Sequence, residues 1–166
     1  QHAVLDEQAL DANIHDRAEF SCGVAALDDY LHRFALQQHR KGVGNVYVLV
    51  DTAKPGLILG FYTLSAAQVD CGELRDTDRK KLPRYPIPCF RMGRLACRSD
   101  HQGHGLGKLL LGCAVDRCLK ARQQVAADAL LVDAKDDGAK AFYVHFGFTP
   151  LLDAKLALYL PLGHQQ

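Results

Sequence analysis

A glycine-rich turn is the part of this sequence whose residue types point most directly to a binding chemistry. The turn Gln102–Lys108 reads Gln-Gly-His-Gly-Leu-Gly-Lys and lies between a strand-like run, Cys89–Cys97, and a helix-like run, Lys108–Ala114. Backbone N–H groups at the start of a helix point outward, and the helix dipole adds partial positive charge there. The turn therefore predicts a site for a phosphate or pyrophosphate group.

Two other phosphate-binding turns do not match this one. A dinucleotide-binding turn has Gly-x-Gly-x-x-Gly spacing early in the fold, with an acidic residue about 20 residues later, whereas this turn lies past the middle of the chain and has a different spacing. A P-loop ends in Gly-Lys-Ser/Thr, but Leu109 stands where the magnesium-binding hydroxyl should be. The sequence therefore argues against a nucleotide triphosphatase.

The spacing Gln-x-x-Gly-x-Gly at Gln102, Gly105 and Gly107 is a weak signal alone, but the motifs on either side of it make it more specific. Arg94–Ala96 precedes the turn, and Ala141–Phe148, which reads Ala-Phe-Tyr-Val-His-Phe-Gly-Phe, follows about one strand and one helix later. Together these motifs resemble the GNAT family of acetyl-CoA-dependent N-acetyltransferases.

Further motifs resemble one subgroup of that family over nearly the whole chain. They lie at Asp16–Leu31, Gly60–Ser65 and Leu82–Pro88. The subgroup consists of toxins of toxin–antitoxin systems that acetylate the amino group of aminoacyl-tRNA. The chain departs from its pattern at Cys97-Arg98, where Val or Ile followed by Asp is usual, and in its small net charge of +1.

The resemblance implies a mixed α/β GNAT fold. Its sheet is mostly antiparallel, is flanked by helices, and splays between strands 4 and 5, near Arg94 and Leu131, where acetyl-CoA would enter. The backbone of Leu95–Cys97 would bind the pantetheine arm and the thioester, and the turn would hold the pyrophosphate. The predicted cofactor-binding residues are Leu95, Ala96, Cys97, Gln102, Gly103, His104, Gly105, Leu106, Gly107, Lys108 and Phe142.

Some side chains of these motifs have two interpretations. Lys108 either adds charge at the pyrophosphate or is a solvated helix residue, and His104 is expected to be an exposed turn residue rather than a catalyst. Tyr143 is the expected catalytic residue, because attack of an amine on a thioester releases a thiolate, which a phenol with a pKa near ~10 can protonate. The alternative is that Tyr143 is a buried aromatic beside Phe142 and Phe146.

The third predicted strand bears on the acceptor, because Cys89–Arg98 contains no Asp or Glu. A lysine amine, with a pKa near ~10.4, needs a general base at neutral pH, whereas an α-amine has a pKa nearer ~8. An adjacent ester should lower the α-amine's pKa further. The acid-free strand therefore favours an α-amine acceptor such as aminoacyl-tRNA, although Glu19 or another carboxylate could fold into the site.

A set of basic residues is predicted to bind the acceptor, because RNA phosphates bind such patches. Its members are Arg79, Lys80, Lys81, Arg84, Arg91 and Arg94. Two alternatives stand beside this interpretation: Arg94 is a structural strand residue, or the cluster Arg79–Lys81 is a solvated loop whose charge nearby acidic residues offset.

The length of the chain, together with a sequence that shows no internal repeat and no linker, predicts one domain over residues 1–166. A helix is expected between the turn Phe20–Gly23 and the glycine breakers of Lys41–Asn45, with helical apolar spacing over Leu27–Gln38 that includes Phe34. Another is expected from the glycine turn to about Arg122, with Leu109 in its buried stripe. A third is expected to start at Asp136 and Asp137 and to stop at Gly147. Residues 71–88 read as a loop. The expected strands are Val46–Val50, Leu57–Val69, Cys89–Cys97, Ala129–Ala134, Phe148–Leu151 and Leu156–Leu160.

The residue composition bears on the cellular location, on metal binding and on membrane spans. The six cysteines form no Cys-x-x-Cys pair, so we interpret them as buried, reduced side chains, which indicates the cytoplasm. No His pair has metal-ligand spacing, so no metal is predicted, and no apolar run approaches the roughly 20 residues of a membrane span. The resemblance implies a ribbon-helix-helix antitoxin as partner and a possible homodimer.

The sequence favours acetyl transfer from acetyl-CoA to aminoacyl-tRNA, which inhibits translation. Two alternatives remain open: a GNAT enzyme for a small amine or a protein amino group, and a non-catalytic acyl-CoA-binding module.

Overall fold

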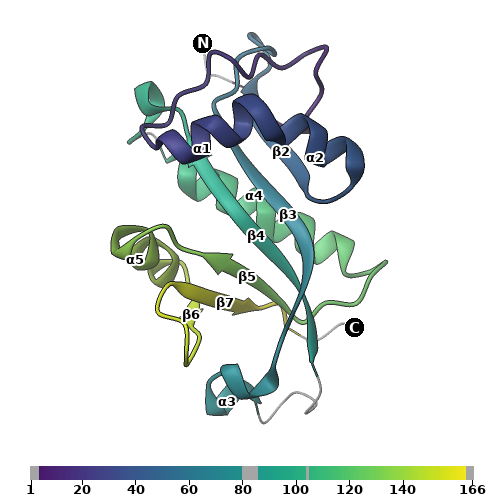
Figure 1. Cartoon of the computed structure of the whole chain (residues 1–166), viewed down its shortest axis with the longest axis vertical. Coiled ribbons are helices and arrows are strands. Elements are labelled where there is room, and N and C mark those ends of the chain that lie inside the picture. Colours follow the sequence, from purple (N-terminus) through teal and green to yellow (C-terminus); the bar gives the residue numbers. More distant parts are fainter. Residues whose placement is uncertain (1–3, 80–85, 104, 164–166) are drawn as a thin grey trace. The chain divides into compact units, whose positions relative to one another are not determined.

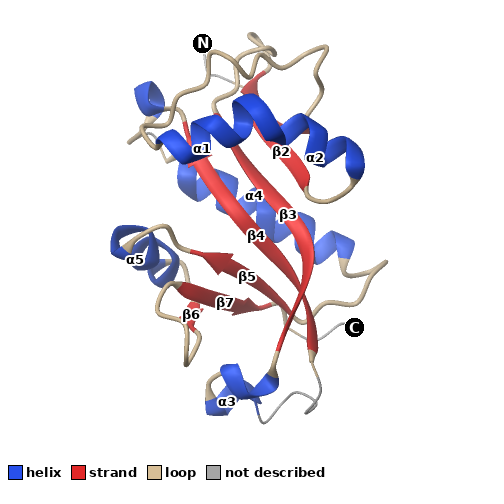
Figure 2. Cartoon of the chain, in the orientation of Figure 1, coloured by secondary structure: helices blue, strands red, loops and turns tan. Residues whose placement is uncertain are grey.

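The computed structural model describes residues 4–79, 86–103 and 105–163. They form a mixed α/β fold with a seven-stranded sheet in the order β1-β2-β3-β4-β5-β7-β6 (Figures 1 and 2). The strands are β1 (Leu5–Ala9), β2 (Asn45–Asp51), β3 (Gly60–Val69), β4 (Ile87–Cys97), β5 (Ala129–Asp133), β6 (Thr149–Pro150) and β7 (Ala157–Pro161). The helices are α1 (Ala25–Asp29), η1 (Tyr30–Phe34), α2 (Ala35–Lys41), η2 (Cys71–Glu73), α3 (Asp76–Arg79), η3 (Ser99–His101), α4 (Leu106–Ala121) and α5 (Asp137–His145).

The chain divides into two compact units, so the prediction of a single domain over 1–166 stays a prediction. One unit falls within Gln1–Ser65 and Arg94–Ala114, and the other within Ala66–Gly93 and Val115–Gln166. Strands β3 and β4 and helix α4 contribute residues to both units.

The first unit is built on the hairpin of β2 and β3, two of the predicted strands, which pair antiparallel from Asn45↔Leu64 to Leu49↔Gly60. In Figure 1, α1, η1 and α2 lie on one face of these strands and the first part of α4 lies on the other. Alternate residues of β2, including Val46 and Val48, pack with Tyr30 of η1 in a core cluster. Val46, Val48 and Val50 share one face of β2, because successive side chains of a strand point to opposite faces, and this is the face that the helices cover.

Strand β1 was not expected from the sequence. It pairs antiparallel with β2 from Leu5↔Asp51 to Ala9↔Tyr47 and forms the end of the strand order. Its sequence, Leu-Asp-Glu-Gln-Ala, lacks the alternation that marks a half-buried strand. An edge strand with charged residues avoids pairing with other chains, so its polarity hides it from a hydrophobicity pattern.

The helix predicted over Leu27–Gln38 is interrupted by a π-helical turn, η1. The N–H group of Ala35 donates to the carbonyl of Tyr30, five residues earlier, instead of four. This longer turn buries Tyr30, Leu31 and Ala35, whereas Phe34 is 42% exposed. Phe34 shares the predicted helical spacing with Tyr30 and Leu31 but not their burial, because the π-turn shifts the helical register that the 3.6-residue period assumes.

The predicted helix after the glycine turn is α4, which ends at Ala121. Its buried residues are Leu106, Leu110, Leu111, Ala114 and Cys118. Leu109 is 41% exposed, so its place in the buried stripe was wrong. Apart from Leu111, the buried residues recur every four positions from Leu106, and Leu109 does not fall on that series.

The second unit contains the parallel pair of the sheet, β4 and β5. Their register runs from Cys89↔Ala129 to Met92↔Val132, although β4 itself continues to Cys97. An end of pairing within β4 is the feature expected of a sheet that splays between strands 4 and 5. Strand β7 then pairs antiparallel with both β5 and β6.

Hydrogen bonds between side chains and the backbone join distant segments of this second unit. The buried Arg122 guanidinium donates to the carbonyls of Leu162 and Gly163 at 2.6 and 2.7 Å. The segment expected to be a loop, 71–88, contains the short helices η2 and α3. The N–H group of Arg75, between them, donates to the hydroxyl of buried Tyr159 at 3.2 Å, which fixes part of this segment on β7.

Candidate functional site

The glycine turn joins β4, through η3, to the first turn of α4. Gly103 and Gly105 have φ angles of +87° and +75°, in the left-handed region that only glycine adopts readily. The N–H group of Leu109 donates to the carbonyl of Gly105 at 3.1 Å, which begins the α4 ladder. The N–H groups of Leu106, Gly107 and Lys108 belong to the first turn, whose donors have no partner within a helix. The described part of the turn thus has the local geometry of an anion site.

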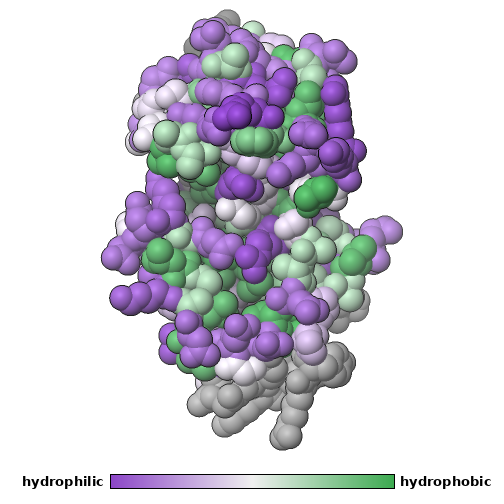
Figure 3. All heavy atoms as spheres, in the orientation of Figure 1, coloured by the Kyte–Doolittle hydropathy of each residue, from purple (hydrophilic) through white to green (hydrophobic). Residues whose placement is uncertain are grey.

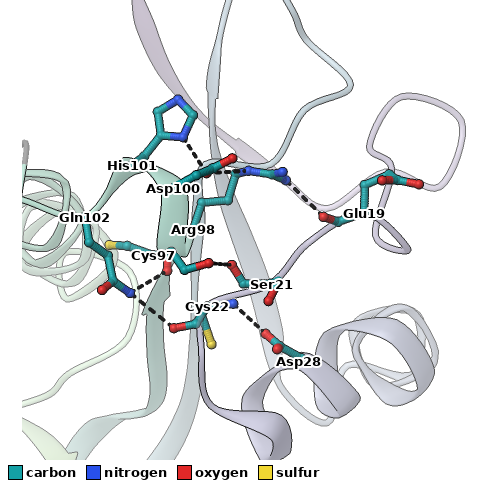
Figure 4. Close-up of polar contacts among 10 residues, drawn as sticks. Glu19, Ser21, Cys22, Asp28, Cys97, Arg98, Asp100, His101 and Gln102 are labelled. Atoms are coloured by element: carbon teal, nitrogen blue, oxygen red, sulfur yellow. Dashed lines mark hydrogen bonds and ion pairs between the residues drawn. The ribbon is translucent and has the colours of Figure 1, made fainter.

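The side chain of Gln102 holds this turn in place (Figure 4). Its amide nitrogen donates to the carbonyls of Cys22 and Cys97 at 3.1 and 3.3 Å. Both of its N–H donors are therefore used within the protein. Gln102, predicted as a cofactor-binding residue, is thus placed to position the turn rather than to donate to a phosphate. His104, also predicted, lies outside the described residues, and Lys108 is exposed.

The end of β4 precedes the turn and holds the other predicted cofactor-binding positions. Ala96 is buried, whereas Leu95 and Cys97 are partly exposed. Burial, together with the nearby Cys22 thiol, raises the pKa of Cys97 to about 11, so its thiol is neutral near pH 7. The described cysteines Cys22, Cys89, Cys97, Cys113 and Cys118 are all free thiols.

Tyr143 lies on α5 in the second unit and is 6% exposed. Its ring packs between those of Phe142 and Phe148, with centroids 5.3 and 5.4 Å away. Within the described part of the chain its hydroxyl makes no hydrogen bond. Burial, and then the negative charge of Asp133, raises the pKa of Tyr143 to about 12. The phenol is therefore protonated at neutral pH and its hydroxyl can act as a donor, with Phe142 as its packing partner.

The local sequence explains why Tyr143 is held so firmly. The carboxylate of Asp136 caps α5 by accepting from the N–H group of Ala139 at 2.8 Å. The helix ends at a left-handed glycine, Gly147, with φ of +96°. The N–H group of Phe148 then donates back to the carbonyl of Tyr143 at 3.0 Å. In the motif Phe-Tyr…Gly-Phe the glycine thus ends the helix and turns the chain back, so that Phe148 packs against Tyr143.

Asp133, at the end of β5, was missed by the sequence analysis. Its carboxylate pairs with the guanidinium of Arg91 at 3.0 Å and is the charge that acts on Tyr143. The parallel register sets Arg91 opposite Leu131, two residues before Asp133 and on the same face. The signal was therefore the pairing of β4 with β5, which a single sequence does not display.

The basic residues predicted to bind the acceptor differ in whether an acidic side chain offsets their charge. Arg91 has its charge offset by Asp133. The guanidinium of Arg94 instead lies 3.6 Å above the ring of Tyr30, and within the described residues it has no carboxylate partner. The positive charge of Arg94 thus lies over an aromatic ring, and no carboxylate in the described part of the chain offsets it. Arg79 ends α3, whereas Lys80, Lys81 and Arg84 lie outside the described residues.

The described residues were compared with the requirements of a metal site and of a membrane-spanning helix. Among them, no group of three or more His, Cys, Asp or Glu side chains could hold a metal ion. No helix in the same part of the chain is long and apolar enough to cross a membrane. On the face drawn in Figure 3, hydrophilic side chains alternate with smaller apolar groups.

Comparison with known proteins defines the class to which this fold and turn belong. The acetyltransferase (GNAT) domain family matches residues 43–150. A tRNA-acetylating toxin of Mycobacterium tuberculosis (strain ATCC 25618 / H37Rv) is 39% identical over 133 residues, which cover 80% of this chain and 78% of that protein. The chain belongs to the GNAT family of acetyltransferases.

Solved structures place the chain beside particular members of the family. AtaT complexed with acetyl-methionyl-tRNAfMet superposes with a TM-score of 0.88 at 30% identity, with 95% of each chain covered. A tyrosine-to-phenylalanine mutant of the AtaT toxin, bound to acetyl-CoA and the C-terminus of the antitoxin AtaR, superposes with a TM-score of 0.81 at 29% identity. The match covers 95% of this chain and 93% of that one. The predicted family and fold class are thereby confirmed.

Proposed function

We propose that this protein is a toxin that transfers the acetyl group of acetyl-CoA to the α-amine of aminoacyl-tRNA and so inhibits translation. The observation that carries the proposal is the similarity of most of the chain to a tRNA-acetylating toxin. The likeness to AtaT, solved with acetyl-methionyl-tRNA, supports the same acceptor.

The donor end of the reaction rests on the glycine turn. The first-turn N–H groups of α4 would bind the pyrophosphate of coenzyme A, and the backbone of Leu95–Cys97 would bind the pantetheine arm. The left-handed Gly103 and Gly105 let the backbone turn without a side chain in the way. Lys108 is exposed beside these donors, where an ammonium group can add attraction for phosphate.

The acceptor end rests on charge and on the acid-free strand. Strand β4 contains no carboxylate, and an α-amine with a pKa near ~8 is partly neutral at physiological pH without a general base. Arg94, held on Tyr30 and without a carboxylate partner among the residues that the structure describes, offers its guanidinium to an RNA phosphate. These features favour an aminoacyl ester of RNA over a lysine side chain.

Tyr143 is the proposed general acid. The neutral amine attacks the thioester carbonyl, the C–S bond breaks, and the new amide nitrogen releases a proton to water. The sulfur receives the proton of the Tyr143 hydroxyl, which solvent then restores. A pKa of about 12 keeps the phenol protonated before each turnover, as a general acid requires.

The partner and the location of the protein follow from the same proposal. An antitoxin of the ribbon-helix-helix class would neutralise it, in line with the solved complex of AtaT with AtaR, and a homodimer is a further expectation. We propose a cytoplasmic location, because aminoacyl-tRNA is used there. Reduced cysteines are consistent with this setting.

Mass spectrometry of bulk aminoacyl-tRNA tests the activity. After incubation with isotopically labelled acetyl-CoA, we expect labelled N-acetyl-aminoacyl ends. Tyr143→Phe should lower the rate by about 10²–10⁴-fold, the usual contribution of a general acid, without loss of acetyl-CoA binding. Its melting temperature should not change, because the ring packing is kept and the hydroxyl makes no hydrogen bond in the described part of the chain.

Tyr47→Phe, on β2, is the matched control and should keep the wild-type rate. Acetylation of free amines with no acetylated tRNA would contradict the proposed acceptor and favour a small-amine or protein acetyltransferase. Binding of acetyl-CoA without turnover on any acceptor would instead indicate a non-catalytic module. An unchanged rate in Tyr143→Phe would remove Tyr143 from the chemistry.

A further inference from the structure

A short segment outside the helices and strands, Glu19–Cys22, crosses the first unit between the glycine turn and the N-terminal helices, and we call it the strap. Residues of η3 and of the glycine turn donate to its carbonyls (Figure 4). The contacts run from Arg98 Nη1 to Glu19 O at 3.1 Å, from the Ser99 N–H and Oγ to Ser21 O at 2.8 and 3.1 Å, and from Gln102 Nε2 to Cys22 O at 3.1 Å.

The strap is held from its other side by α1 and η1. The Nε2 of His32 on η1 donates to the remaining carbonyl, that of Phe20, at 2.8 Å. The N–H group of Cys22 donates to the carboxylate of Asp28 on α1 at 2.8 Å. Every carbonyl of the strap is therefore engaged, by the turn side or by the helix side.

The helix side leads directly to the proposed acceptor surface. Tyr30, at the start of η1, carries the guanidinium of Arg94 on its ring at 3.6 Å. The ring of Tyr30 is itself stacked on Phe61 of β3, with centroids 6.2 Å apart. The strap thus joins the proposed pyrophosphate turn to the π-turn that holds Arg94, and π-turns recur at functional sites.

We propose that the strap couples the two binding events, so that coenzyme A at the turn orders η1 and raises the affinity for the acceptor. Arg98, Ser99 and His32 are the positioning residues of this coupling. A ligand that fixes the turn also fixes the strap, and a second ligand then has less conformational entropy left to lose. The identity of the second ligand rests on the proposed function, whereas the ordering of η1 does not.

Arg98 makes the link particular to this chain. The pattern that the chain resembles has Asp at this position, and a carboxylate cannot donate to the Glu19 carbonyl. Arg98 also pairs with Asp100 through Nε and Oδ1 at 3.0 Å, and Asp100 in turn binds His101 at 2.7 Å. Its guanidinium is thus held on η3 while its other edge reaches the strap.

Hydrogen–deuterium exchange with coenzyme A as the probe tests the coupling without any acetyl transfer. In the wild-type protein, saturating coenzyme A should slow amide exchange in the turn and α4 and also in 25–34. His32→Ala should keep the wild-type affinity for coenzyme A and the protection of α4, but lose the protection of 25–34. Arg98→Ala should weaken coenzyme A binding and also lose the protection of 25–34, even at saturation.

Arg40→Ala, which removes an exposed arginine from α2, is the matched control and should behave as wild type. The proposal is overturned if coenzyme A leaves exchange in 25–34 unchanged in the wild-type protein, or if His32→Ala retains that protection. These readouts do not depend on tRNA, so a failure to acetylate tRNA would overturn the proposed acceptor and leave the coupling to be judged separately.

Steady-state kinetics provide a second readout. His32→Ala should raise the KM for aminoacyl-tRNA by about 5–10-fold, within the usual range of coupling between two sites, while kcat changes little. Ser99→Ala should show the same split in a weaker form, and Ser99→Thr, which keeps the hydroxyl, should restore the wild-type KM. Equal KM values in Ser99→Ala and Ser99→Thr, or a fall in kcat alone in His32→Ala, would contradict the coupling.

Discussion

Burial is the main cause of the raised pKa values of the thiols and phenols in the core of this protein. Tyr143 is the clearest case, since its raised pKa has burial as the first cause and Asp133 as the second. The type and spacing of Tyr143 could be identified from the sequence, because Phe-Tyr…Gly-Phe marks a helix end. Its charge partner could not, because Asp133 reaches the site through strand pairing rather than through sequence proximity.

His15 gives a pH dependence of stability that can be checked. Its Nδ1 accepts from the N–H group of Asp11 at 2.9 Å, and its Nε2 donates to Gln8 at 2.9 Å, which requires a neutral ring. Burial lowers the pKa of His15 below its ordinary value, against a smaller opposing effect of Asp11. The unfolded chain therefore binds a proton more readily, so this contribution to stability is present above about pH 6.5 and is lost as the pH falls.

Thermal unfolding at about pH 8 and about pH 5.5 measures this effect. The melting temperature should fall with acidification, and it should fall less in His15→Asn, whose amide oxygen keeps an acceptor for Asp11 N–H. For a chain of this size about 1 kcal/mol corresponds to roughly 2–4 °C. His145→Asn, at an exposed position, is the control, and an equal acid shift in His15→Asn and wild type would contradict the assignment.

At the scale of elements, the close approach of α4 to β3 sets where the glycine turn lies. A Cβ at Gly60 would stand 2.5 Å from Leu110 Cδ1 and 2.9 Å from the carbonyl oxygen of Ala96. The Leu110 tip can rotate away, but the backbone of β4 cannot. Gly60 is therefore required by packing, and it is the first residue of β3, which begins later than the predicted strand Leu57–Val69.

Gly60→Ala should lower the free energy of unfolding by about 1–3 kcal/mol, the usual cost of overpacking. It should also weaken coenzyme A binding, because the end of β4, which leads into the glycine turn, must shift. Gly112→Ala is the matched control on α4, where a Cβ would meet nothing within 4 Å. That change should stabilise the protein by up to about 1 kcal/mol, because alanine favours a helix over glycine. Denaturant unfolding and calorimetric titration with coenzyme A measure both effects. An unchanged free energy of unfolding in Gly60→Ala would show that β3 and β4 move apart at little cost and would contradict the packing requirement.

The elements also show which parts of the fold a sequence can predict. The hairpin of β2 and β3, the glycine turn, α4 and α5 follow from apolar periodicity and glycine punctuation, which are local. The π-turn η1 and strand β1 do not, because each is decided by packing against distant residues. Gln102 combines the two cases: its presence in the turn motif is local, whereas its bonds to Cys22 and Cys97 depend on the strap.

At the scale of the whole molecule, the proposed activity predicts a cellular effect. Expression without an antitoxin should arrest growth, because acetylated aminoacyl-tRNA cannot take part normally in translation. Tyr143→Phe should permit growth, and co-expression of a cognate antitoxin should restore it for the wild-type protein. Colony counts after induction measure the effect. Unimpaired growth with folded, acetyl-CoA-binding protein would contradict a toxin role.

The protonated thiol of Cys97 has a consequence for the fate of the acetyl group. In the proposed donor site this cysteine ends the strand that would carry the thioester. With a pKa of about 11, only about one thiol in 10⁴ is a thiolate at pH 7, and the thiolate is the nucleophilic form. Cys97 is therefore a poor trap for acyl groups. In the proposed site Cys97 would therefore rarely take the acetyl group from a bound donor, so the thioester would survive at this position until an acceptor binds.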